Sequence, residues 1–177
     1  MKKKPIYLWI LLVLSALISA SSLFGILGPV PSKEVLRANL SNSGSLTAQQ
    51  IEDTVNYTYQ VTAASHSIFN VVLIVLSAIL VVVAFVFLVR KNVQFANYAY
   101  LGYLLLAIVG LVYSFVNIQD ALQLIKDDTL GLGIGTLAKG TVILFMIINV
   151  LFLALVFYKM WRQQKDLAEE AEAEEVA

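Results

Sequence analysis

Residues 68–89 read IFNVVLIVLSAILVVVAFVFLV and contain no charged side chain. The many β-branched residues favour a strand in water, but the stretch is far longer than an average strand of about five or six residues. Crossing the hydrocarbon core of a bilayer takes about 20 apolar residues. Within lipid, a single segment satisfies its own backbone hydrogen bonds only as a helix. The stretch therefore predicts a transmembrane helix.

Three further stretches of similar character lie between the charged residues, and they are residues 6–27, 98–116 and 141–158. Each is apolar around the whole helix circumference, as expected where one side faces lipid and the other a packed helix. Only 14% of the 177 residues are charged, against about 25% in an average soluble domain. We therefore predict an all-α integral membrane protein with four transmembrane helices.

The composition also limits the chemistry. Twelve Lys and Arg residues balance twelve Asp and Glu residues, which gives no basic surface for nucleic acid. The chain has no cysteine and one histidine, so thiolate or imidazole sites are nearly excluded. None of the four apolar stretches contains an ionisable residue other than tyrosine, whereas pumps and ion-coupled transporters need such residues within the membrane. The adjacent Asp127 and Asp128 lack the several convergent oxygens of a cation site. We expect no enzyme, cofactor or metal site.

The distribution of positive charge predicts the orientation. Cytoplasmic loops of membrane proteins are enriched in Lys and Arg. If the N-terminus is inside, the inner segments hold eight such residues: Lys2, Lys3, Lys4, Arg90, Lys91, Lys159, Arg162 and Lys165. The outer loops hold four: Lys33, Arg37, Lys126 and Lys139. Tyrosine and tryptophan also gather at the inner span ends, as in aromatic belts. Both signals place the two termini in the cytoplasm and make the chain a multi-pass protein of the cell membrane.

These signals divide the chain into nine segments. They are a cytoplasmic N-terminus (1–5), the first span (6–28), an extracellular loop (29–66), the second span (67–90), a cytoplasmic turn (91–96), the third span (97–117), an extracellular loop (118–138), the fourth span (139–161) and an acidic cytoplasmic tail (162–177). An alternative is cleavage of the first span as a signal peptide after Ala20, which would leave three spans and an outer N-terminus. The apolar run continues to Val30, longer than a signal peptide needs, and favours an uncleaved anchor.

The first outer loop is predicted to be partly helical. Pro29 and Pro31 stop the first span, and Ser32 can cap a short helix with the sequence KEVLRANL. Thr47 and Gln50 form a capping box at the start of a second helix. Because no glycine or proline follows before the membrane, we expect one continuous helix over 48–89, in which the outer loop extends the second span.

Two sets of residues are candidates for contacts between helices. Ile51, Val55 and Tyr59 recur every four residues and form an apolar stripe on the outer helix. The KEVLRANL helix or a subunit partner would cover this stripe. Small residues at helical spacing within the spans let backbones approach closely, and they are Ser15, Ser19, Gly110 and Ser114. The polar residues within the spans serve either as contacts between helices or as the lining of a wet path, and they also include Asn70, Ser77 and Asn149.

The second outer loop contains Gly131, Gly133 and Gly135 in the sequence TLGLGIGTL. Three alternate glycines predict a flexible backbone leading into the fourth span. The tail after Trp161 turns acidic, which predicts a solvated helical extension or a docking site for a basic partner.

The function expected from these features is that of a non-enzymatic accessory or structural subunit of a bacterial membrane complex, associated with a transporter or the cell envelope. Its partners would be the lipid bilayer and either another membrane protein or further copies of this chain. Two alternatives stay open. One is a self-assembling channel or facilitator for a small solute, lined by serine and asparagine. The other is a membrane protein for immunity or envelope stress.

Overall fold

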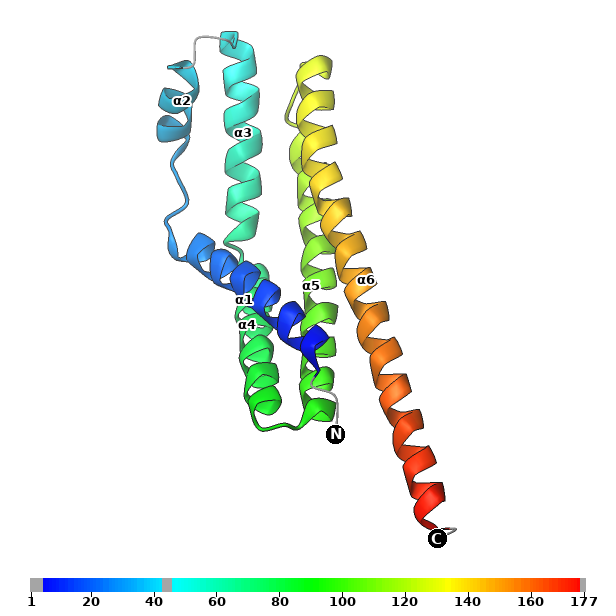
Figure 1. Cartoon of the computed structure of the whole chain (residues 1–177). Helices are drawn as coiled ribbons and strands as arrows, with labels where there is room; N and C mark the ends of the chain where they lie inside the picture. The colour runs from blue at the N-terminus through cyan, green and yellow to red at the C-terminus, as the bar shows by residue number, and fades with distance from the viewer. Residues whose placement is uncertain (1–4, 43–45, 176–177) are drawn as a thin grey trace.

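The described part of the chain folds into six helices (Figure 1). This computed structural model describes the backbone of residues 5–42 and 46–175. The helices are α1 (Ile6–Leu27), α2 (Lys33–Ser41), α3 (Ala48–Ser65), α4 (Ile68–Val89), α5 (Val93–Leu122) and α6 (Asp128–Glu175), and these residues contain no strand. Except for Pro5, the expected cytoplasmic N-terminus falls outside the described residues, as do the last two residues of the acidic tail.

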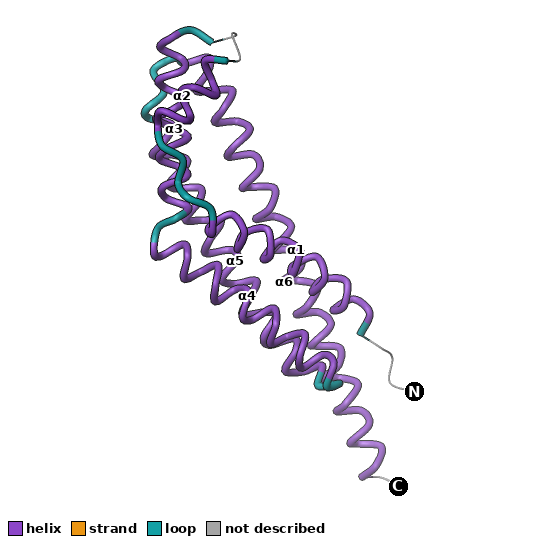
Figure 2. Tube along the Cα trace, turned by 90° about the vertical axis from the view of Figure 1, so that its left-hand side faces the viewer, coloured by secondary structure: helices purple, strands orange, loops and turns teal. Residues whose placement is uncertain are grey.

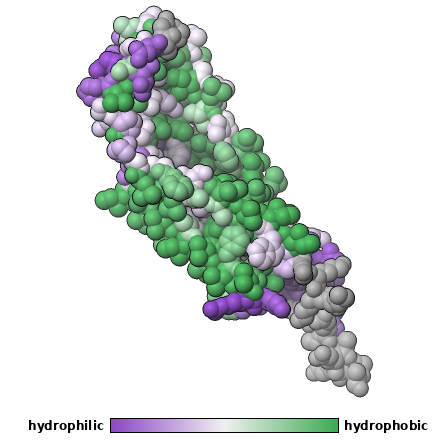
Figure 3. Space-filling view, turned by 60° about the vertical axis from the view of Figure 1, so that its left-hand side comes forward, coloured by the Kyte–Doolittle hydropathy of each residue, from purple (hydrophilic) through white to green (hydrophobic). Residues whose placement is uncertain are grey.

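Four of these helices, α1, α4, α5 and α6, are long and apolar enough to cross a membrane. This confirms the all-helical prediction and its four long apolar helices. Apolar side chains cover the middle of the face seen in Figure 3, and hydrophilic side chains gather toward its ends. Figures 1 and 2 both place the described ends of the chain at one end of the bundle and α2 and α3 at the other.

The bundle is packed most tightly at the end that holds the chain termini. There α4 and α6 pack on α5, while α1 crosses α4 obliquely. The core at this end includes Leu8, Leu12, Ala84, Tyr100, Leu104 and Val156. A short polar chain joins three of the helices: the Tyr7 hydroxyl donates to Asn97 Oδ1 (3.0 Å), and the Asn97 amide donates to Gln163 Oε1 (3.3 Å). These two bonds link α1, α5 and α6 to one another.

The prediction of one continuous helix over 48–89 is wrong, because α3 and α4 are separate helices. The Ser67 hydroxyl accepts a hydrogen bond from the Asn70 backbone N–H (3.3 Å) and caps α4. His66 Nε2 lies 3.0 Å from the Gly28 carbonyl oxygen at the end of α1. Serine competes for backbone hydrogen bonds and so ends or starts helices without any glycine or proline.

The glycine-rich segment is also not the flexible loop that the sequence predicts, because Gly131, Gly133 and Gly135 all lie within α6. A Cβ at Gly135 would lie 3.1 Å from Leu122 Cδ1, and one at Gly131 would lie 3.6 Å from Ile125 Cγ2. Each glycine costs about 1 kcal/mol in a helix relative to alanine. Because glycine has no side chain, Gly131 and Gly135 allow α6 to approach the end of α5 closely.

The small domain formed by α2 and α3 begins as the sequence indicates. Ser32 caps α2 through the Val35 N–H, and the Thr47–Gln50 capping box is present. The two helices pack on each other, and an ion pair between Arg37 and Glu52 joins their exposed sides.

A buried carboxylate fastens this domain to the rest of the bundle. Asp53 on α3 accepts a hydrogen bond from the Lys126 backbone N–H (2.8 Å) in the turn between α5 and α6, and another from Gln49 Nε2 (2.7 Å). The bond from Lys126 fixes the turn against α3, whereas the bond from Gln49 lies within α3. The outer domain is therefore attached to α5 and α6 as well as to α4.

A second bond joins the same parts. Gln50 Nε2 donates to Asp127 Oδ2 (3.0 Å), and the Leu130 N–H donates to Asp127 Oδ1 (2.8 Å). Both bonds lower the pKa of Asp127, and the backbone bond from Leu130 has the larger effect. The carboxylate is thus favoured in its ionised form in the folded chain, and its contribution to stability is lost as the pH falls through the lowered pKa.

Substitution of Asp53 tests this attachment. Asp53→Ala removes both acceptors and leaves the Lys126 N–H without a partner, which costs about 1–3 kcal/mol. We expect a lower unfolding temperature in detergent. The matched control is Glu52→Ala at the next residue, whose carboxylate is exposed and makes only the surface pair with Arg37; it is expected to change stability little. Equal effects of the two substitutions would contradict the role given to Asp53.

Candidate functional site

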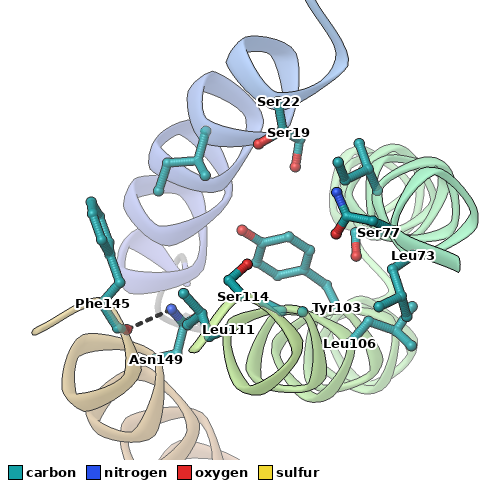
Figure 4. Close-up of a pocket in the computed structure, with 15 residues that line it drawn as sticks. Ser19, Ser22, Leu73, Ser77, Tyr103, Leu106, Leu111, Ser114, Phe145 and Asn149 are labelled. Atoms are coloured by element: carbon teal, nitrogen blue, oxygen red, sulfur yellow. Dashed lines mark hydrogen bonds between the residues drawn. The ribbon is translucent and has the colours of Figure 1, made fainter. Parts of the chain in front are cut away.

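A cavity of about 340 Å³ lies between α1, α4, α5 and α6 (Figure 4). Its lining comes from all four long apolar helices. Its polar lining residues are Ser19, Ser22, Asn70, Ser77, Tyr103, Ser114 and Asn149, and its apolar ones include Ile18, Leu73, Leu106 and Phe145. The cavity is therefore a place where side chains from distant parts of the sequence meet.

The cavity occupies the half of the bundle nearer the α2–α3 domain. The hydroxyls of Ser67 and Tyr113 bond to each other (2.8 Å) where α4 begins. The cavity follows α4 from Asn70 to Ser77, which is about 10 Å along the helix. At the other limit lies Tyr103, whose ring stacks on that of Tyr100. The packed core described above closes the bundle beyond this pair.

The cavity hydroxyls differ from other hydroxyls in the long helices. Ser21 and Thr141 donate to the carbonyl oxygen one turn earlier in their own helix, which satisfies them locally. In contrast, the hydroxyls of Ser19, Ser77 and Ser114 make no hydrogen bond with any residue that the structure describes. The same is true of Ser22 and Tyr103. Every fully buried side-chain nitrogen or oxygen among the described residues has a partner, so these free hydroxyls are accessible from the cavity or the surface.

Two asparagines add acceptors to these hydroxyls. Asn70 Nδ2 donates to the Ser65 carbonyl oxygen (2.7 Å), and Asn149 Nδ2 donates to that of Phe145 (2.8 Å; Figure 4). In both, the Oδ1 atom receives no hydrogen bond from a described residue. The cavity thus offers both donors and acceptors.

The lining carries no formal charge, since the described residues around the cavity include no Asp, Glu, Lys, Arg or His. In the described part of the chain there is also no group of three His, Cys, Asp or Glu residues that could hold a metal ion. The arrangement can therefore bind a neutral molecule through hydrogen bonds, but it presents no acid, base or nucleophile pair.

Three of the four small residues singled out in the sequence meet at this cavity: Ser19, Gly110 and Ser114. The fourth, Ser15, lies deeper and forms a buried hydrogen bond with the Tyr100 hydroxyl (3.0 Å). A Cβ at Gly110 would meet no atom within 4 Å. Within this chain Gly110 therefore borders open space, and close packing against another helix stays a prediction.

Sequence reasoning missed Ser22 and Tyr103 as parts of the site. Tyr103, Gly110 and Ser114 are spaced by seven and four residues, which places them on one helix face. This spacing could have identified Tyr103 as part of the site. Ser22 lies one turn after Ser19 and could have been identified in the same way.

The apolar stripe of Ile51, Val55 and Tyr59 lies elsewhere, on α3, which packs against both α2 and α5. Val55 is fully buried, and the Lys33 ammonium lies 5.2 Å from the centre of the Tyr59 ring. The chain itself thus covers part of the stripe, and contact with a partner there stays a prediction.

The model of one protein family, described as a domain of unknown function (DUF8777), matches residues 1–169. The chain belongs to this family. No curated protein and no solved structure matches the chain.

Cysteine labelling tests whether the cavity admits water, and a chain without native cysteine is well suited to it. Ser114→Cys places a thiol on the cavity, whereas Val112→Cys places one on an exposed apolar position of the same helix. Because the thiolate is the reacting species and forms only where water reaches, we expect Ser114→Cys to react about tenfold faster with a small methanethiosulfonate in membranes. Equal rates would show that the cavity is dry.

Proposed function

We propose that this member of the DUF8777 family is a non-enzymatic multi-pass membrane protein that serves as an accessory subunit of a bacterial membrane complex. The proposal rests on one observation: an uncovered apolar face of α6 that continues past the level at which α4 starts. The partner would be a membrane protein whose helix packs along this face.

The position of α6 follows from its contacts with α5. Tyr113 on α5 marks the start of α4 through its bond to Ser67. Leu122, nine residues further along α5, lies against Gly135. Nine helical residues correspond to about 13 Å. The first turns of α6 therefore lie at the level of α3, beyond the start of α4 (Figure 1).

The exposed side of this part of α6 is suited to contact with another helix. Leu132 is 72% exposed and Leu137 is 76% exposed. Gly133 and Gly140 lie on the same face of the helix, and a Cβ at either would meet no atom within 4 Å. Small residues flanked by larger apolar ones let a second helix approach closely. The same face continues toward the chain end with Ile143, Leu144, Ile147 and Leu151, all exposed.

The two leucines matter because of where they lie. Within lipid an uncovered apolar face is already in an apolar medium and gains little from a partner. Beside the outer domain the same side chains would contact water, and burying a leucine there contributes about 1.5–3 kcal/mol. A partner that covers both leucines is therefore favoured.

The cavity supports this proposal over the alternative of a facilitator. Its neutral, hydroxyl-rich lining suits a small solute. However, the packed core around Leu12, Tyr100 and Leu104 fills the bundle beyond it. One chain therefore has no continuous path, and a pore would have to form between several copies.

A photo-crosslinking amino acid at Thr136, between the two leucines, tests the proposal in native membranes. We expect a crosslink to a different membrane protein that falls at least about tenfold when Leu132 and Leu137 are both changed to Asp. Val35→Asp is the matched control, since Val35 is also an exposed apolar residue but lies on α2. Crosslinks to a second copy alone would favour self-assembly, and no protein crosslink would remove the proposal.

The proposed orientation places both termini in the cytoplasm, supported by eight Lys and Arg residues in the inner segments against four in the outer ones. A membrane-impermeant maleimide is expected to label Val35→Cys on intact cells and Lys165→Cys only after permeabilisation, since both positions are exposed. The reverse pattern would invert the topology.

A further inference from the structure

We propose that the cavity between α1, α4, α5 and α6 binds the uncharged, hydroxyl-bearing head of a small amphiphile, of the chemical kind found in diacylglycerol. The shared chemistry is a neutral glycerol-type group, which a membrane lipid or a free polyol can supply. This site is separate from the partner face of α6 and does not depend on it.

The free hydrogen-bonding groups define the ligand first. Five hydroxyls and two amide oxygens face the cavity or its edge without a partner among the described residues. In an apolar surrounding each unsatisfied polar group is costly. A ligand that carries both hydroxyl and ester groups can donate to the asparagine oxygens and accept from the hydroxyls.

The absence of charge in the described lining defines the ligand further. A phosphate or an ammonium group placed here would meet no counter-ion from the lining residues, and an unpaired charge in a poorly solvated site is strongly disfavoured. Phospholipids with a charged or zwitterionic head are therefore poor ligands. The volume of about 340 Å³ lies at the small end of ligand pockets, which span roughly 300–1,000 Å³. It suits a glycerol-sized head rather than a whole lipid.

The edge of the cavity indicates how a lipid would enter. Ile18 on α1 is 48% exposed and Phe145 on α6 is 42% exposed. Both line the cavity, and Figure 4 shows Phe145 extending from α6 beside α1. Because α1 crosses the bundle obliquely, this edge is not closed by tight packing of α1 on α6. A ligand's acyl chains can remain in lipid outside this apolar edge while its head reaches the hydroxyls.

The level of the cavity agrees with this entry. It begins about one turn from Ser67, where α4 starts, and ends at Tyr103. If α4 spans the membrane, this range adjoins the boundary between the headgroups and the hydrocarbon, where the glycerol groups of lipids lie. The closed end at Tyr103 and Tyr100 makes the cavity a binding site rather than a passage.

A matched pair of glycine substitutions tests the site. Gly110→Leu fills the cavity without meeting a neighbouring atom at Cβ, and Gly25→Leu adds the same side chain at an equally open position on α1 that does not line the cavity. The purified full chain is placed in phosphatidylcholine vesicles with a small fraction of a photoreactive diacylglycerol. We expect labelling of cavity residues to fall about tenfold in Gly110→Leu and to stay unchanged in Gly25→Leu.

A second variant removes polarity without filling space. The double substitution Ser114→Ala with Asn149→Leu keeps the apolar walls, and Ser21→Ala is its control, because Ser21 bonds within its own helix. We expect labelling to fall about fivefold or more in the double variant and not in the control. The unfolding temperature of each variant shows whether it is folded. If Gly110→Leu fails to fold, the double variant still tests the binding site.

Competition identifies the source of the ligand. Excess unlabelled diacylglycerol is expected to displace the probe, whereas phosphatidic acid is not. If free glycerol displaces it equally well, the site takes the same neutral group from a soluble polyol. Equal displacement by phosphatidic acid, or labelling unaffected by both cavity variants, would overturn the proposal. The variant in which Leu132 and Leu137 are both changed to Asp separates the two proposals. We expect it to lose the partner crosslink and to keep the diacylglycerol labelling.

Discussion

In segments surrounded by hydrocarbon, a hydrogen-bonding group finds its partner within the protein or remains unsatisfied. At the terminal end of this bundle the partners are present: Ser15 meets Tyr100, and at the edge of the predicted spans Asn97 joins Tyr7 to Gln163. In the other half, the five hydroxyls that line the cavity make no hydrogen bond with a described residue. This contrast makes the second half the candidate site.

The four long helices could be predicted from the sequence because length and lack of charge are local properties. The caps at Ser32 and Thr47 were equally local and are confirmed. The break at Ser67 was not predictable in the same way, because nothing in its neighbours forbids a helix and the His66 ring contacts Gly28, 38 residues earlier. The helical state of the glycine segment likewise depends on contact with Leu122 in another helix.

The cavity shows the same division between local and distant information. Its serines and asparagines were visible as polar residues in apolar segments, but their convergence depends on the oblique crossing of α1, which no residue pattern encodes. One face of α5 could be recognised from the spacing of Tyr103, Gly110 and Ser114. The spacing did not indicate which helices this face contacts. The identity of the neighbouring helices required the assembled bundle.

The attachment of the outer domain has a mechanical consequence. α6 is one uninterrupted rod of 48 residues, and its first turn is held through Asp127 to Gln50 on α3. The rod is about 72 Å long, and Val156, further along it, is buried in the packed core. One continuous helix therefore joins the outer domain to that core, and the stretch between them carries Phe145 at the edge of the cavity.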